Sequence, residues 1–206
     1  MKLTTMRCGP GLLLLVLCCW GCVSLERSYP DKRYFVIEIP GDAKAASPES
    51  DRVLLMLNLH ISPRYGDTSF VYRTSDTAYE SDFYNQFLSS PATMISEEIR
   101  KRLSASPVFK FIIGPASQLT ANYVLEGSIN ALYGDFRNLS APRAVLELEF
   151  FLRSDDPAKP GILLHRSYTK SVPISQRSPE ALVAGWNQAL EAIVSMLLAD
   201  LGNAKL

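Results

Sequence analysis

The sequence predicts an α+β fold: a mainly antiparallel sheet with two amphipathic helices packed on one face. Residues 143–153 alternate apolar and polar side chains, a period that predicts a strand with one buried face. Residues 91–103 and 179–201 instead repeat apolar side chains at helical spacing. Because each helix has a single apolar stripe, both stripes need an apolar surface, and the buried face of the sheet provides it.

Composition and charge narrow the class of protein. The 206 residues are 47% hydrophobic and 20% charged, which is enough to bury the core of one domain. Lys2 and Arg7 lie in a leading segment that we expect to be removed, so the rest has 21 − 2 = 19 basic residues against 21 acidic ones. This balance gives no basic surplus for binding nucleic acid.

The first residues have the pattern of an export signal. Lys2 and Arg7 stand in a stretch without acids, residues 11–20 are apolar, and Gly21 precedes a cysteine. The apolar run is shorter than the roughly 20 residues that span a bilayer. All four cysteines lie in residues 8–22, so a disulfide framework in the body of the protein is excluded.

The end of this signal resembles the cleavage site of bacterial lipoproteins, where Gly or Ala precedes the lipidated cysteine. Gly21 and Cys22 fit that pattern, whereas Trp20 is bulkier than the usual residue. We expect Cys22 to carry the lipid. Cys19 is the alternative acceptor, and a plain signal peptide without lipidation is the other interpretation. Several acyl chains on one residue would make an effectively permanent anchor.

These features divide the chain into three parts. We predict a signal peptide at 1–21, a lipidated tether at 22–33 and a single domain at 34–206. Val23 stands where Asp retains lipoproteins at the inner membrane in many Gram-negative bacteria. The absence of Asp favours the periplasmic face of the outer membrane, with the inner membrane as the alternative.

The first half of the domain is expected to contain strands at 34–39 and 53–62, then a hairpin of 70–73 and 77–80. A Pro-Gly pair ends the first strand. Alternation in the second strand predicts a buried face that comprises Leu55, Leu57, Leu59 and Ile61.

A Ser-Pro pair marks the start of each helix, since Ser is favoured as an N-cap and Pro at the first helical position. Ser90-Pro91 begins the first helix, and Ser178-Pro179 begins the second. The apolar stripe of the first helix comprises Ile95, Ile99 and Leu103. The longer apolar face of the second comprises Leu182, Trp186, Leu190, Ile193, Leu197 and Leu201.

Four more strands are expected between the helices, at 109–113, 121–136, 143–153 and 161–172. A tight connection near Asn138 predicts that the second and third of these are antiparallel neighbours.

The residue types that catalysis or metal binding needs are sparse. His60 and His165 have no partner at metal-ligand spacing, and the sequence has no nucleophile elbow or glycine-rich phosphate loop. Asp155-Asp156 fits a solvated turn better than an acid–base pair. The sequence therefore predicts a protein that is not an enzyme, with no cofactor and no metal site.

An aromatic-rich stretch at 83–88 precedes the first helix. It leads into the helix and packs under the core, or it forms a contact surface, since aromatic residues favour interfaces. Residue types alone leave both interpretations open.

Several segments together are similar to the ABC-type transport auxiliary lipoproteins, the family of the paraquat-inducible lipoprotein C type. The shared segments are the lipidated start, the Tyr-rich strand at 34–37, the Val71-Tyr72-Arg73 cluster, the strand at 121–127 and the Ala-rich helix at 181–189. The resemblance covers nearly the whole chain after the signal. It departs at Phe87, where the family often has Trp.

The resemblance implies a non-catalytic auxiliary component of an intermembrane lipid transport system. Such systems pair an inner-membrane ABC transporter or permease with a periplasmic protein that bears mammalian cell entry (MCE) domains. That protein would reach this lipoprotein at the outer membrane. A homo-oligomeric ring of several copies would multiply weak contacts with a tubular partner.

The partner-contact residues that we predict are Tyr72, Arg73, Asp82 and Tyr84. They are polar or aromatic, and Tyr and Arg carry binding energy more often than other residues. The alternative for two of them is a salt bridge between Arg73 and Asp82 across the hairpin. Two other functions stay open: a periplasmic lipoprotein that regulates a cell-wall enzyme, and a carrier that holds a lipid in its own cavity.

Overall fold

The computed structural model describes residues 30–41, 47, 50–204 and 206. Lys32–Leu206 forms one compact unit, and the description below concerns this unit. The expected signal peptide and the expected lipidation site, Cys22, lie outside the described residues.

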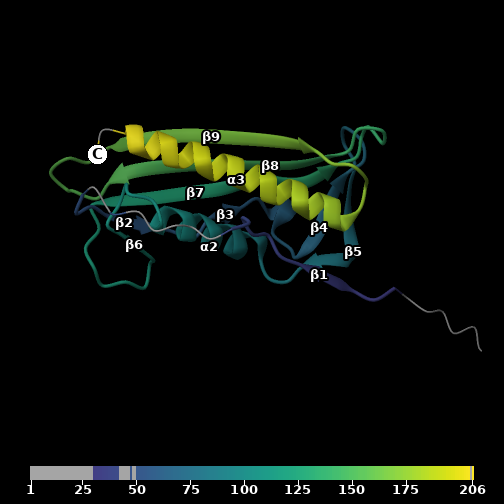
Figure 1. Cartoon of the computed structure of the whole chain (residues 1–206), viewed down its shortest axis with the longest axis horizontal. Coiled ribbons are helices and arrows are strands. Elements are labelled where there is room, and N and C mark those ends of the chain that lie inside the picture. The colour runs from purple at the N-terminus through teal and green to yellow at the C-terminus, as the bar shows by residue number, and fades with distance from the viewer. Residues whose placement is uncertain (1–29, 42–46, 48–49, 205) are drawn as a thin grey trace, which may run out of the picture. The chain divides into compact units, whose positions relative to one another are not determined.

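Within the described residues, nine strands build one mixed sheet, and two helices pack on it (Figure 1). The strands are β1 (Arg33–Phe35), β2 (Val53–Met56), β3 (His60–Ile61), β4 (Ser69–Arg73), β5 (Tyr79–Phe87), β6 (Phe111–Ile113), β7 (Tyr123–Asp135), β8 (Arg143–Ser154) and β9 (Ile162–Pro173). The helices are α2 (Pro91–Ser104) and α3 (Pro179–Asn203), and a short 3₁₀ turn, η2, spans Pro63–Tyr65. The fold is α+β, as predicted.

The directions of the strands differ from the prediction. One path through the sheet runs β1-β5-β4-β7-β2-β6, while β8 and β9 continue from β7 as a meander. Five of the eight pairings in the described part of the chain are parallel, so a mainly antiparallel sheet is not confirmed. The antiparallel pairings are β4–β5, β7–β8 and β8–β9.

The long strand β7 explains most of the parallel pairings. Three short strands, β2, β3 and β4, share one of its edges and pair in turn with its start, middle and end. The chain returns from β4 to β7 through β5, α2 and β6, and a long return of this kind is what parallel neighbours need. Side-chain alternation identifies a strand but does not give the direction of its neighbour, which explains the error.

The β7–β8–β9 meander provides the buried face of the sheet. β7 and β8 are antiparallel neighbours joined by the Asn138 connection, as expected. The fully buried side chains of β8 include Leu146, Leu148, Phe150 and Leu152. A register shift between Ile129 and Ala131 changes which residues of β7 face the core. Leu132 is therefore buried, whereas Tyr133 is only partly buried.

Some details of the first strands were predicted wrongly. The expected strand at 53–62 is broken into β2 and β3, so a single alternation does not run through it. Leu59 is buried as predicted, but the other buried residues are Leu54 and Met56, whereas Leu55, Leu57 and Ile61 are only partly buried. β1 ends earlier than expected, and β5 continues to Phe87 beyond the expected hairpin.

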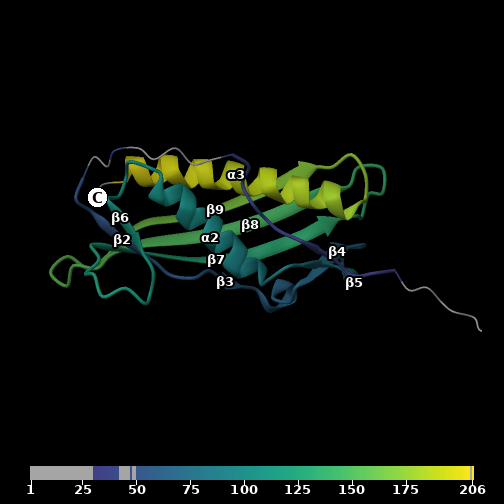
Figure 2. The ribbon, with the colours of Figure 1, turned by 60° about the horizontal axis from the view of Figure 1, so that its bottom comes forward.

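Both helices lie on the same face of the sheet, as predicted (Figures 1 and 2). The predicted stripes of α2 and α3 are fully buried. A Cβ at Gly185 of α3 would lie 2.6 Å from the Cβ of Ala144 on β8, so glycine permits the close approach of helix and sheet. Among the residues described, α3 is the one helix long and apolar enough to cross a membrane, and its apolar stripe is buried in the core while Val183, Met196 and Leu198 are partly buried.

The segment after β1, residues 36–41, runs across the two helices (Figure 2). Helix side chains hold its backbone. The N–H of Ile39 donates to Oε2 of Glu98 at 3.0 Å, and Arg102 donates to the last three carbonyl oxygens of the segment. Ile37 and Ile39 are buried, so this segment closes the core at the helices.

Candidate functional site

A surface hollow of about 420 Å³ lies where the β4–β5 hairpin meets β1 and the start of α3. Tyr72 and Asp82, two of the predicted contact residues, line it. The other lining residues are Arg33, Thr74, Glu80, Asn85, Phe136, Leu139, Arg177 and Pro179. Because its wall carries side chains of both charges, the hollow suits a polar protein surface better than an acyl chain.

Strand β5 bulges beside this hollow. From the Ser69–Gln86 pair to the Val71–Ser81 pair, β4 advances by two residues while β5 advances by five. The extra residues of β5 have no partner on β4, and a bulge of this kind bends a strand and re-aims its side chains.

The carboxylate of Asp82 holds the bulge together. Its Oδ1 accepts the backbone N–H groups of Tyr84 at 2.8 Å and Asn85 at 3.0 Å. Its Oδ2 accepts the hydroxyl of Tyr72 at 2.6 Å and the side-chain amide of Asn85 at 2.7 Å. Since these bonds are internal to the site, Asp82 gives the site its shape.

Burial and these hydrogen bonds shift the pKa values of both acids. Burial, and then the hydrogen bond to Asp82, raises the pKa of Tyr72 above its usual value. Burial acts to raise the pKa of Asp82 as well, but the hydrogen bonds from Tyr72 and Asn85 outweigh it and hold that pKa below its usual value. At neutral pH the pair is therefore a phenol that donates to a carboxylate.

Arg73 lies apart from the hollow. Alternation along β4 turns it to the face opposite Tyr72, where its guanidinium lies 5.7 Å from the centre of the Tyr79 ring. Arg73 also donates to the carbonyl oxygen of Asp76 at 3.0 Å. The alternative salt bridge between Arg73 and Asp82 is not what these residues form, because Asp82 accepts from Tyr72 instead.

The aromatic stretch at 83–88 divides between the two interpretations. Phe87 is buried, with its ring 5.4 Å from the Trp186 ring, so it belongs to the core. Phe83 is 63% exposed, and its ring meets the half-buried Tyr84 edge-on at 5.3 Å. The stretch mostly forms the end of β5, and alternation sends its aromatic rings to both sides of the sheet.

Sequence reasoning missed Arg33, at the start of β1. Its Nε and Nη2 donate to Oδ1 of Asn85 at 3.1 and 2.8 Å, and its Nη1 donates to Oε1 of Glu180 at 2.5 Å. Arg33 thereby joins β1 to β5 and α3, although its partners are 52 and 147 positions away in the chain. No local pattern in the sequence could reveal pairing at that separation.

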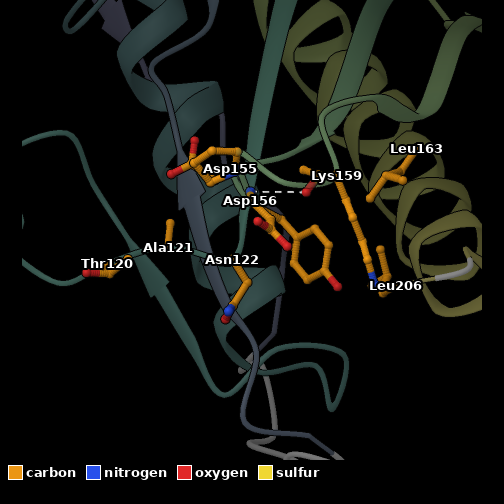
Figure 3. Close-up of a pocket in the computed structure, with 11 residues that line it drawn as sticks. Thr120, Ala121, Asn122, Asp155, Asp156, Lys159, Leu163 and Leu206 are labelled. Carbon is orange, nitrogen blue, oxygen red and sulfur yellow. Dashed lines mark hydrogen bonds between the residues drawn. The ribbon is translucent and has the colours of Figure 1, made fainter.

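A second hollow of about 570 Å³ lies near the start of β7 and the end of β8 (Figure 3). Asn122, Asp155, Asp156 and Lys159 give it a polar and charged wall. The N–H of Asp155 donates to the carbonyl oxygen of Asn122 at 2.9 Å. The two aspartates lie in the connection after β8, as expected, and their charges suit water better than a stored acyl chain.

On the exposed face of the meander, His165 pairs with Glu149. Nε2 of His165 lies 2.7 Å from Oε1 of Glu149, and the imidazole stacks on the Phe151 ring at 4.3 Å. The hydrogen bond to His165 holds the pKa of Glu149 below its usual value. In the part of the chain that the structure describes, no cluster of three or more potential metal ligands occurs.

A family model described as ABC-type transport auxiliary lipoprotein component matches residues 35–197. No curated protein matches the chain.

Solved structures share the fold at low sequence identity. A Xanthomonas campestris protein assigned to the DUF330 family is 17% identical, with a TM-score of 0.64, and the match covers 82% of this chain and 91% of that one. An uncharacterized protein is 15% identical, with a TM-score of 0.63 and coverage of 82% and 98%. A hypothetical protein of Chlamydia trachomatis is 14% identical, with a TM-score of 0.51 and coverage of 74% and 98%.

Proposed function

Because the chain belongs to the ABC-type transport auxiliary lipoprotein component family, we propose that it is the lipid-anchored, non-catalytic subunit that receives a periplasm-spanning partner of an intermembrane lipid transporter. The partner is a protein with MCE domains that links an inner-membrane ABC transporter or permease to the periplasmic face of the outer membrane. Cys22 carries the anchor, and residues 22–31 of the predicted tether lead to the compact unit, which begins at Lys32.

The observation that carries this proposal is the hollow at β1, β5 and α3. Arg33 and Arg177 line it together with Glu80, and Leu139 beside them is 61% exposed. An exposed apolar side chain surrounded by groups of both charges is typical of a protein interface, which has an apolar centre and a polar rim.

The four predicted contact residues take different parts in this proposal. Tyr72 and Asp82 fix the shape of the hollow through their hydrogen bond. Tyr84 follows them in the bulge, and Arg73 lies on the opposite face of the sheet. We therefore assign the direct contact with the partner to the exposed residues Leu139 and Arg177, which line the same hollow.

A homo-oligomeric ring belongs to the same proposal. Several copies around one tubular partner would raise the effective concentration of each docking surface. Weak contacts at single hollows would then add up to stable attachment.

A pull-down of the detergent-solubilised lipoprotein with the MCE-domain protein encoded beside its gene tests the docking surface. Leu139→Asp combined with Arg177→Glu should weaken binding at least about tenfold, because a charge enters the apolar contact and a cation is reversed. Both side chains are exposed, so the melting curve should stay that of the wild type.

Leu119→Asp combined with Lys159→Glu is the matched control. It makes the same chemical changes at exposed positions outside the docking hollow, and it should keep the partner. Equal recovery of the partner by both double variants would place docking elsewhere. A wild-type protein that recovers no partner and purifies with a stoichiometric phospholipid would favour the carrier function, and recovery of a cell-wall enzyme would favour the regulator.

A further inference from the structure

Exposed apolar side chains gather at the β1–β5 edge of the sheet. Tyr34, Val36, Phe83 and Leu88 are 56%, 41%, 63% and 65% exposed, and they lie on β1, on β5 or directly after them. They make up four of the nine large apolar side chains that are exposed among the described residues. Together with Lys32 they form a surface that we call the edge patch.

Alternation along β1 separates this patch from the docking hollow. Arg33 and Phe35 turn toward the helices and the core, where Arg33 donates to Glu180 on α3. Tyr34 and Val36 therefore turn to the opposite face of the sheet. The hollow and the edge patch thus lie on opposite faces of the same strands.

The bulge of β5 brings Phe83 to the patch. Asp82 holds the bulge through the backbone N–H groups that follow Phe83. The ammonium of Lys32 lies 4.1 Å from the centre of the exposed Phe83 ring, a favourable cation–π contact. This contact joins the first residue of the compact unit to the bulge.

We propose that the edge patch lies in the headgroup region of the phospholipid bilayer that carries the anchor. This inference rests on the proposed lipidation of Cys22. Residues 22–31 are ten residues, which span at most about 35 Å when fully extended. They end at Lys32, which belongs to the patch, so the patch has the shortest connection of any surface of the domain to the membrane.

The residue types fit a bilayer interface. Tyr rings are enriched at the headgroup level of membrane proteins, and Lys reaches the phosphate groups while its stem covers apolar surface. Tyr34 and Lys32 supply this pair. Phe83, Val36 and Leu88 add apolar surface that the boundary with the acyl chains accepts.

A protein partner would fit the same patch less well. It would have to cover the ammonium of Lys32, and desolvation of a charge is costly unless an acid pairs with it. The phosphate groups of the membrane surface supply that anion. β1 is three residues long, which leaves little backbone for pairing with a strand of a second copy.

Brominated phospholipids test the contact, because bromine in the bilayer quenches an indole that enters it. Phe83→Trp is made in the full chain, and acylation of the purified protein is verified by mass. The protein is then placed in vesicles of phosphatidylcholine and phosphatidylglycerol. Acyl-brominated phosphatidylcholine should reduce the fluorescence of the introduced indole at least about twofold, since interfacial side chains lie within roughly 5–10 Å of the acyl boundary. Trp186 is fully buried and gives a constant background.

Phe111→Trp is the matched control. Phe111 is 51% exposed on β6, at the opposite end of the sheet path from β1, and its replacement should stay unquenched. Equal quenching at both positions, or none at Phe83→Trp, overturns the proposal. The proposal is also overturned if the fluorescence of the Phe83→Trp indole is quenched neither by aqueous acrylamide nor by bromine, because a second copy would then cover the patch.

The outcome is separable from that of the docking proposal. A chain without acyl groups overturns the membrane contact directly. If the Leu139→Asp and Arg177→Glu double variant loses the MCE-domain partner, and the indole of Phe83→Trp is still quenched, both proposals are supported, each at its own surface. Quenching without any partner binding in the wild type supports the membrane contact and removes the docking function.

Discussion

At the scale of single residues, Asp82 connects the two faces of the β1–β5 edge. Toward the helices it accepts the hydroxyl of Tyr72, which lines the docking hollow. Through the bulge it sets the position of Phe83 in the edge patch. A charged acceptor with several donors makes strong hydrogen bonds, so one carboxylate determines the geometry of both surfaces.

Asp82→Asn should lower the free energy of unfolding by about 1 kcal/mol at pH 7, because the site is partly solvated and the amide keeps the shape but loses the charge. The pKa of Asp82 in the folded protein lies below its ordinary value of 3.8. Its stabilising contribution is therefore complete above that ordinary value and is lost as the pH falls through the lower folded value. Urea unfolding should show that the difference in free energy of unfolding between wild type and variant is smaller at pH 3 than at pH 7.

Asp67→Asn, at an exposed position after η2, is the control for this series. Hydrogen bonds with Arg137 and His165 also lower the pKa values of Asp135 and Glu149. Protonation of these two acids destabilises wild type and variant alike, so it cancels in the difference between their free energies of unfolding. A wild-type-to-variant difference that does not change with pH would show that Asp82 is not the titrating acceptor.

At the scale of elements, the packing of α3 on the sheet depends on a close approach at one turn of the helix. Gly185 faces Ala144 of β8. The next residue, Trp186, donates from Nε1 to the carbonyl oxygen of Val145 at 3.2 Å, and its ring meets Phe70 edge-on at 5.1 Å. The indole can reach the carbonyl of Val145 because glycine leaves no side chain between helix and strand.

Gly185→Ala should destabilise the protein by about 1–3 kcal/mol through overpacking. The new Cβ would lie 2.6 Å from the Cβ of Ala144 and 2.8 Å from Cγ2 of Ile174, so α3 must move away from the sheet. Adding Ala144→Gly removes one of these clashes and should restore part of the loss in a thermal melt. Gly202→Ala, with nothing within 4 Å, should melt at least as high as the wild type. If Gly185→Ala had the melting temperature of the wild type, the close packing of α3 on the sheet would be refuted.

Elements were predictable where a period was unbroken. The stripe of α3 and the alternation of β8 gave the correct buried faces, because the period alone decides which side chains share a side. At 53–62 the strand breaks between β2 and β3, so only Leu59 of the four residues predicted as buried is buried, and Leu55, Leu57 and Ile61 are partly buried. Strand direction depends on the connections, and no period in the sequence encodes it.

The candidate site was predictable only in part, for the same reasons. Tyr72 and Asp82 could be proposed from residue type, although Asp82 lies beyond the predicted hairpin of 70–73 and 77–80, on the part of β5 that the sequence did not predict. The role of Arg33 depends on partners that the fold alone brings close. The sequence could have predicted that Arg73 points to the face opposite Tyr72, because neighbours along a strand point to opposite faces.

At the scale of the whole domain, the two proposed surfaces support one another. The edge patch and the docking hollow lie on opposite faces of β1 and β5. Contact of the patch with the bilayer would restrain the rotation of the domain and keep the hollow close to the membrane, where the proposed periplasm-spanning partner would end. Restraint before binding lowers the entropic cost of docking, so the anchor would strengthen attachment without a new protein contact.

This arrangement depends on where the anchor is attached, and we predict acylation at Cys22. Mass spectrometry of the mature protein should find Cys22 at the N-terminus with two or three acyl chains, since each buried methylene adds about 0.8 kcal/mol and one chain holds only marginally. Cys22→Ser should abolish acylation, whereas Cys19→Ser, the matched control within the same export segment, should be acylated like the wild type. The reverse result would move the acceptor to Cys19 and lengthen the tether by about 10 Å, which weakens the argument that the edge patch is held at the bilayer. An unmodified N-terminus at Val23 or later would remove the anchor, and the membrane contact with it.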